Sequence, residues 1–76
     1  MRLSDLQTKD VVNVYDGVNL GRIVDAEVNE EGHIAYFVIE KKKLMKRIFS
    51  GNNDILITIK DIKKIGSDVI LVEYNQ

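Results

Sequence analysis

The fold of this chain is decided by residues 11–28, which read VVNVYDGVNLGRIVDAEV. Two apolar segments stand on either side of an Asp-Gly pair at positions 16 and 17, and such a pair accepts the positive φ of a tight hairpin turn. In the second segment Val24, Ala26 and Val28 alternate with acidic residues. This alternation predicts a strand that turns the three apolar side chains inward and the acids toward solvent.

The rest of the chain repeats this pattern of short apolar segments separated by turn residues. Strands are expected at residues 11–15, 20–28, 34–39, 54–59 and 68–74, with an ambiguous sixth segment at 44–49. Ile62 and Ile65 are three residues apart, which predicts one helical or 3₁₀ turn near residues 60–65 with both isoleucines on the core. Short strands at this spacing predict a small all-β barrel or sandwich.

Length and composition restrict the possible functions. A chain of 76 residues forms a single domain, residues 1–76, with a small core. The absence of cysteine excludes disulfides, thiolate metal sites and a cysteine nucleophile, and the net charge of −1 disfavours a generally basic nucleic-acid binder. No apolar run has the length of a signal peptide or a membrane span, so we expect a cytoplasmic protein.

Two predicted strands are apolar on both faces, namely residues 34–39 and 69–72. A small closed sheet buries one face of each strand, so the second face needs a cover or remains in water. The cover is the turn at 62–65, the N-terminal segment through Leu3 and Leu6, or a second copy of the chain. We expect a homodimer or a protein partner to bury part of this surface, and the apolar residues expected at the interface are Tyr36, Phe37, Ile39, Ile70 and Val72.

Charge is distributed unevenly along the chain. Residues 1–32 carry a net charge of −4, whereas residues 33–66 carry +5. The candidate binding residues in the basic segment are Lys41, Lys42, Lys43, Lys46 and Arg47. Cations beside apolar residues suit an anionic membrane surface, RNA or an acidic protein, and they also suit a solvated loop that keeps a strand edge from aggregating. No base-stacking aromatic residues accompany the lysines, which counts against nucleic acid.

No arrangement of residues indicates catalysis or metal binding. The serines have no histidine near them in sequence, and His33 is expected at the surface where a strand starts, with a metal ligand or pH switch as the alternative. The acidic residues around the second turn are expected to be solvated rather than to hold a cation. They are Asp25, Glu27, Glu30 and Glu31. The sequence therefore predicts no enzyme, no cofactor, no metal and no small-molecule substrate.

Two stretches carry a resemblance to a known family: residues 12–25, VNVYDGVNLGRIVD, and residues 57–72, ITIKDIKKIGSDVILV. They resemble the PRC-barrel domain, the small β-barrel named for the photosynthetic reaction-centre H subunit, and in particular its short stand-alone members of the YlmC/YmxH type. That resemblance implies an adaptor or assembly module without catalytic residues, associated with sporulation. Members commonly carry Pro-Trp where this chain has Thr58-Ile59, and we expect Ile59 to fill the apolar site.

Overall fold

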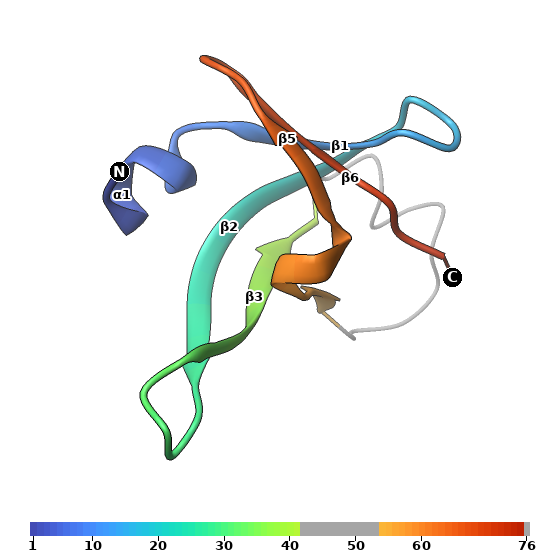
Figure 1. Cartoon of the computed structure of the whole chain (residues 1–76). Helices are drawn as coiled ribbons and strands as arrows, with labels where there is room; N and C mark the ends of the chain where they lie inside the picture. Colours follow the sequence, from blue (N-terminus) through green and yellow to red (C-terminus); the bar gives the residue numbers. More distant parts are fainter. Residues whose placement is uncertain (42–53, 76) are drawn as a thin grey trace.

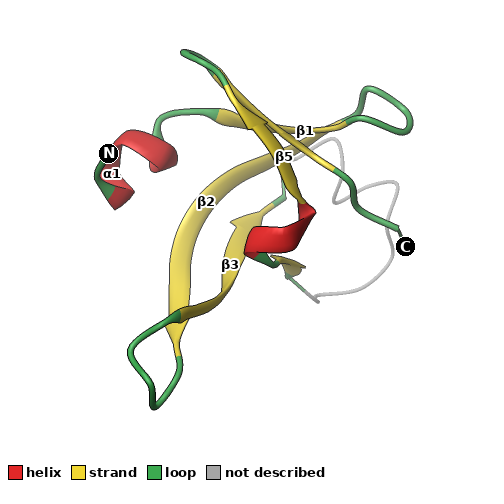
Figure 2. Ribbon diagram, in the orientation of Figure 1, coloured by secondary structure: helices red, strands yellow, loops and turns green. Residues whose placement is uncertain are grey.

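The computed structural model describes residues 1–41 and 54–75 of the chain. Within these residues the chain forms a short helix, six strands and one 3₁₀ turn (Figures 1 and 2). In chain order they are α1 (Leu3–Gln7), β1 (Asp10–Asn13), β2 (Asn19–Val28), β3 (Ile34–Glu40), β4 (Ile55–Ile57), η1 (Ile59–Asp61), β5 (Ile62–Ile65) and β6 (Val69–Val72). The prediction of a mainly β chain with short strands is confirmed.

All six strands belong to one sheet, in the order β4-β3-β2-β1-β6-β5. Neighbouring strands are antiparallel except β1 and β6, which are parallel. The ten-residue strand β2 is visibly curved, so the sheet curls around the side chains on its inner face (Figure 2). Across residues 1–41 and 54–75 the sheet is not closed, because its edge strands β4 and β5 do not pair with each other. The expected barrel is therefore an open, curled sheet.

The first hairpin turn has the chemistry that its sequence predicts. Gly17 has a φ of 71°, and its backbone N–H donates to the carbonyl oxygen of Asn13 at 2.8 Å. The Asp16 carboxylate accepts a hydrogen bond from the backbone N–H of Val18 at 2.9 Å. Glycine adopts this left-handed conformation without the steric cost of a Cβ, so the turn reverses the chain between β1 and β2.

A bulge in β2 overturns the expected burial of its second half. The pairing of β2 with β3 shifts register between Ile23 and Asp25, so one extra residue lies on β2 at this point. Such a bulge breaks the strict inside–outside alternation of a strand. A second register shift lies between Glu27 and Val28, where the strand ends. Ile23 is buried and Ala26 packs against the core, whereas Val24 and Val28 are 45% and 57% exposed. The prediction that Val24 and Val28 would share a buried face with Ala26 is therefore wrong.

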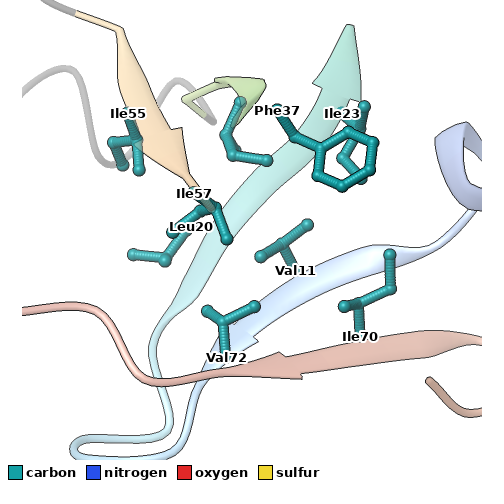
Figure 3. Packing of buried hydrophobic residues seen from close by; sticks show 9 residues of the cluster. Val11, Leu20, Ile23, Phe37, Ile55, Ile57, Ile70 and Val72 are labelled. Carbon is teal, nitrogen blue, oxygen red and sulfur yellow. The ribbon is translucent and has the colours of Figure 1, made fainter. Parts of the chain in front are cut away.

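The apolar core lies on the inner face of the sheet and draws side chains from five strands (Figure 3). Its buried members are Val11, Leu20, Ile23, Phe37, Ile39, Ile55, Ile57, Ile70 and Val72. Partly buried side chains that pack around them are Leu6, Val18, Ala26, Ile62 and Tyr74. A core of this size is small, so single changes in it represent a large part of the total stability.

The helical turn near residues 60–65 is shorter than expected. A 3₁₀ turn covers Ile59–Asp61, and the residues after it form β5. The Asp61 carboxylate accepts hydrogen bonds from the backbone N–H and the hydroxyl of Thr58, both at 3.0 Å, which holds the start of the turn. Residues 62–65 are extended, and Ile62 packs against the core. Ile65 lies opposite the buried Ile70 but remains 39% exposed, so the expectation that both isoleucines lie on the core holds only for Ile62. Ile59 is 56% exposed, so the expectation that it fills an apolar site is wrong.

Helix α1 was not evident in the sequence, because five residues are too few to show a helical period. The backbone N–H of Arg2 donates to the Asp5 carboxylate at 2.8 Å, and the Thr8 hydroxyl donates to the Asp5 carbonyl at the other end. Leu6 packs against the core, whereas Leu3 is 43% exposed. Through Leu6 the N-terminal segment therefore extends the core on the inner face of the sheet.

Candidate interaction surface

Four apolar residues expected at an interface belong to the core instead. Phe37, Ile39, Ile70 and Val72 are each 3% exposed or less. The sequence places apolar residues on both faces of residues 34–39 and 69–72, and alternation alone does not say which face turns inward. The curled sheet buries these four side chains within one copy of the chain, which corrects their expected contact with a partner.

The outer face of the β3–β4 pair carries the opposite set of apolar side chains. Tyr36 and Val38 are two residues apart on β3, and Leu56 lies opposite Val38 on β4. Side chains at these positions share one face of the sheet. Tyr36 and Val38 are half-buried, and Leu56 is 47% exposed. We call these three residues the β3–β4 patch; Tyr36 is the apolar residue expected at an interface that remains accessible.

An acidic border runs along the β3–β4 patch on the neighbouring strand β2. Asp25 lies opposite Val38, and Glu27 lies opposite Tyr36. Both carboxylate side chains belong to exposed residues, as the alternation of the sequence predicts for them. On one side the patch therefore extends to β4, which is an edge strand among the described residues. On the other side it borders on the carboxylates of β2.

Comparison with known proteins agrees with this fold. The chain matches the PRC-barrel domain family over residues 1–76. It belongs to the PRC-barrel domain family. It is similar to "Probable sporulation protein YlmC" of Bacillus subtilis, with 36% identity over 97% of this chain and 93% of that protein. It is also 36% identical to the uncharacterized protein YmxH of the same organism, over 96% of this chain and 88% of that protein. An uncharacterized protein of Clostridium acetobutylicum is 34% identical over 92% of this chain and 80% of its own length.

Leu56 is the residue of this PRC-barrel surface that the sequence reasoning missed. The β-branched residues of the stretch 54–59 predict a strand, but they do not say which of its faces is buried. Alternation contained the missing signal, because Ile55 and Ile57 are buried and the residue between them must then point outward. The outward position of Leu56 followed only once its two neighbours were known to lie in the core.

The basic segment is mostly outside the described residues. Lys41 is half-buried directly after β3, and Lys42, Lys43, Lys46 and Arg47 lie outside the residues that the structure describes. Nothing in the described structure bears on the membrane or RNA alternative, so it stays a prediction.

That alternative has a direct test in the triple variant with Lys41, Lys42 and Lys43 changed to Gln. If the segment binds anionic surfaces, the wild-type chain cosediments with anionic lipid vesicles at low salt and much less at physiological salt, because screening weakens attraction between exposed charges. The triple variant then loses vesicle binding while its far-UV circular dichroism is unchanged. Absence of wild-type binding at low salt would contradict the alternative.

His33 and the acidic turn lie where the sequence places them. His33 is exposed directly before β3, and its backbone N–H donates to the side-chain oxygen of Asn29 at 3.0 Å. Among residues 1–41 and 54–75 no cluster of three or more histidine, aspartate or glutamate side chains is arranged to hold a metal ion. In the same residues no helix has the length and apolar character needed to span a bilayer.

Proposed function

We propose that this PRC-barrel chain is a non-enzymatic, cytoplasmic protein-interaction module that acts in sporulation as a homodimer. The proposal rests on the β3–β4 patch, in which the apolar side chain of Leu56 is 47% exposed. Leu56 lies on β4, an edge strand among the described residues. The link to sporulation is supported by the 36% identity to a protein that is named for that process. The proposal assigns no reaction to the chain, in keeping with the adaptor role implied by its family resemblance.

The edge strand β4 favours a second copy as the occupant of this surface. Its three residues, Ile55–Ile57, are uncharged, and within the described residues β4 pairs only with β3. Two copies of β4 that pair antiparallel about a two-fold axis would place Leu56 opposite its own copy, because Leu56 is the central residue. The two β3–β4 patches would then form one continuous apolar face without opposing like charges within β4.

Leu56→Asp tests the homodimer. The wild-type chain is expected to sediment at twice its 8.7 kDa mass at micromolar concentrations, and Leu56→Asp at 8.7 kDa. The introduced carboxylate would face its own copy in the dimer, whereas it lies in water in the single chain, so folding is retained. Sedimentation equilibrium measures the mass, and far-UV circular dichroism checks the fold.

Val28→Asp is the matched control for this experiment. Val28 is 57% exposed at the end of β2, outside the β3–β4 patch and separated from the β4 edge by β3, and it takes a comparable change from an apolar residue to Asp. The Val28→Asp variant is expected to remain dimeric. A wild-type chain that sediments only at 8.7 kDa, or a Leu56→Asp variant that stays dimeric, would overturn the proposed interface.

A further inference from the structure

The second edge of the sheet, strand β5, differs from β4 in its charge. β5 is the last strand in the sheet order and pairs only with β6 in the part of the chain that the structure describes. Its sequence, Ile62–Ile65, contains two adjacent lysines between two isoleucines. A strand edge that is open on one side presents backbone N–H and C=O groups to which an extended chain can pair.

The two faces of β5 carry different chemistry. Lys64 lies opposite Leu71 of β6, which belongs to the outer face of the sheet. Ile65 lies opposite the buried residue Ile70, and Ile62 packs against the core. A strand added along this edge would therefore meet a cation on its outer face and isoleucine side chains on its inner face.

The lysines make this edge cationic. Lys63 forms an ion pair with Glu73, with 3.5 Å between Nζ and Oε2. Within residues 1–41 and 54–75, Lys60 and Lys64 are exposed and form no ion pair with a described carboxylate. The Asp61 carboxylate, which precedes β5, accepts two hydrogen bonds from Thr58 and keeps its negative charge. β5 itself contains two lysines and no acidic residue, so Lys64 is the cation of this strand that remains available to a partner, and Lys60 lies before the strand in η1.

A shallow hollow beside Lys64 provides room for a side chain. It is lined by Lys64, Gly66, Ser67, Asp68, Val69 and Leu71. The lining includes two half-buried apolar residues, Val69 and Leu71, and one residue of each charge, Lys64 and Asp68. A side chain that enters the hollow from an added strand would keep its charged end near Lys64.

The charges on β5 oppose the pairing of this edge with a second copy of itself. Antiparallel pairing of two β5 strands would bring their lysines, Lys63 and Lys64, close to those of the other copy. Charge complementarity favours an acidic partner instead. Edges β4 and β5 thus differ in their expected occupants, the first suited to a second copy and the second to a different chain.

We infer that the open edge of β5 binds an extended segment of a partner protein in which acidic and apolar residues alternate. The backbone of the segment pairs with β5, its acidic side chains face Lys64 and Lys60, and its apolar side chains lie beside Ile62 and Ile65. This inference goes beyond the proposed homodimer and does not depend on it, because the β5 edge contains none of the residues of the β3–β4 patch.

The test uses a fluorescent short peptide in which glutamate and valine alternate, measured by fluorescence anisotropy against the full chain. Binding of this peptide is expected, and Lys64→Glu is expected to weaken it about tenfold or more through charge repulsion. Arg2→Glu is the matched control, because it makes the same charge change at an exposed position on the N-terminal segment. Its affinity for the peptide is expected to equal that of the wild type.

Two further peptides separate strand addition from simple charge attraction. The same peptide with alternate backbone nitrogens methylated loses its hydrogen-bond donors and is expected to bind about tenfold more weakly or not at all. A peptide with lysine in place of glutamate is expected not to bind. The inference is overturned if the glutamate–valine peptide fails to bind, if the methylated peptide binds equally well, or if a single-stranded RNA of equal charge binds as tightly.

The Leu56→Asp variant separates this inference from the proposed homodimer. A single-copy Leu56→Asp chain is expected to bind the glutamate–valine peptide as the wild type does, because β5 is unchanged. Loss of peptide binding in that variant would overturn the independence of the two edges. A monomeric wild-type chain that binds the peptide would refute only the homodimer.

Discussion

Gly21→Ala is expected to destabilise the folded chain severely. Gly21 lies in β2 with a φ of 130°, a conformation that side-chain-bearing residues rarely adopt. A Cβ at this position would overlap the carbonyl oxygen of Glu40 and lie 2.9 Å from its carbonyl carbon and 3.3 Å from the Cα of Lys41. These are backbone atoms, so the overlap can be relieved only by separating β2 from the end of β3.

The expected loss of stability for Gly21→Ala is about 4 kcal/mol or more, a large part of the roughly 5–10 kcal/mol expected for a domain of this size. Urea denaturation followed by circular dichroism measures it. Gly17→Ala is the matched control, since Gly17 also has a positive φ but no atom lies within 4 Å of its added Cβ. Gly17→Ala is expected to cost only about 1–2 kcal/mol. Equal losses in the two variants would contradict the close approach at Gly21.

Asn13→Ala is expected to destabilise the chain by about 3 kcal/mol, because it removes a buried side chain that makes three part-buried hydrogen bonds to backbone groups. Asn13 is 4% exposed at the end of β1. Its side-chain nitrogen donates to the Tyr74 carbonyl at 2.8 Å. Its side-chain oxygen accepts from the backbone N–H groups of Tyr15 and Tyr74 at 3.2 and 3.3 Å. These bonds connect the first hairpin turn to the chain that follows β6.

Asn29→Ala is the control that isolates the effect of burial. The Asn29 side-chain oxygen also accepts two backbone hydrogen bonds, from Glu31 and His33, both at 3.0 Å. Asn29 is exposed, so water replaces the lost acceptor, and the expected cost is below about 1 kcal/mol. Thermal denaturation of both variants gives the comparison. A cost for Asn29→Ala as large as that for Asn13→Ala would show that burial is not the source of the effect.

The local elements were predictable because local chemistry specifies them. The Asp16-Gly17 turn joins two strands as expected. Thr58 and Asp61 hold a short 3₁₀ turn at Ile59–Asp61, which overlaps the start of the turn predicted near residues 60–65. The assignment of Ile62–Ile65 to β5 was missed, because spacing of three residues fits one helical turn as well as it fits a bulged strand. Pairing with β6, which is a tertiary contact, decides between them.

The candidate interaction surface was only partly predictable. Tyr36 was expected at an interface and remains accessible, whereas Phe37 and Ile39 were expected there and lie in the core. All three belong to a stretch that is apolar on both faces, and such a stretch contains no polar residue that marks the outer face. For the same reason the sequence did not determine whether Leu56 lies on the inner or the outer face of its strand. Lys63 and Lys64 were not among the candidate binding residues, because the sequence predicted a helical turn there and gave no sign that they lie on an edge strand.

The sequence by itself determined that the chain is a mainly β protein of the PRC-barrel family, because turn residues and alternation act between neighbours and the family pattern runs through most of the chain. Only the tertiary structure decided which apolar face is buried, since both faces of β3 and β6 are equally apolar and curvature of the sheet selects one of them. It also decided that β4 and β5 are the edges of the sheet formed by residues 1–41 and 54–75. Strand order depends on pairing between distant residues, such as β1 with β6, which local pattern does not encode.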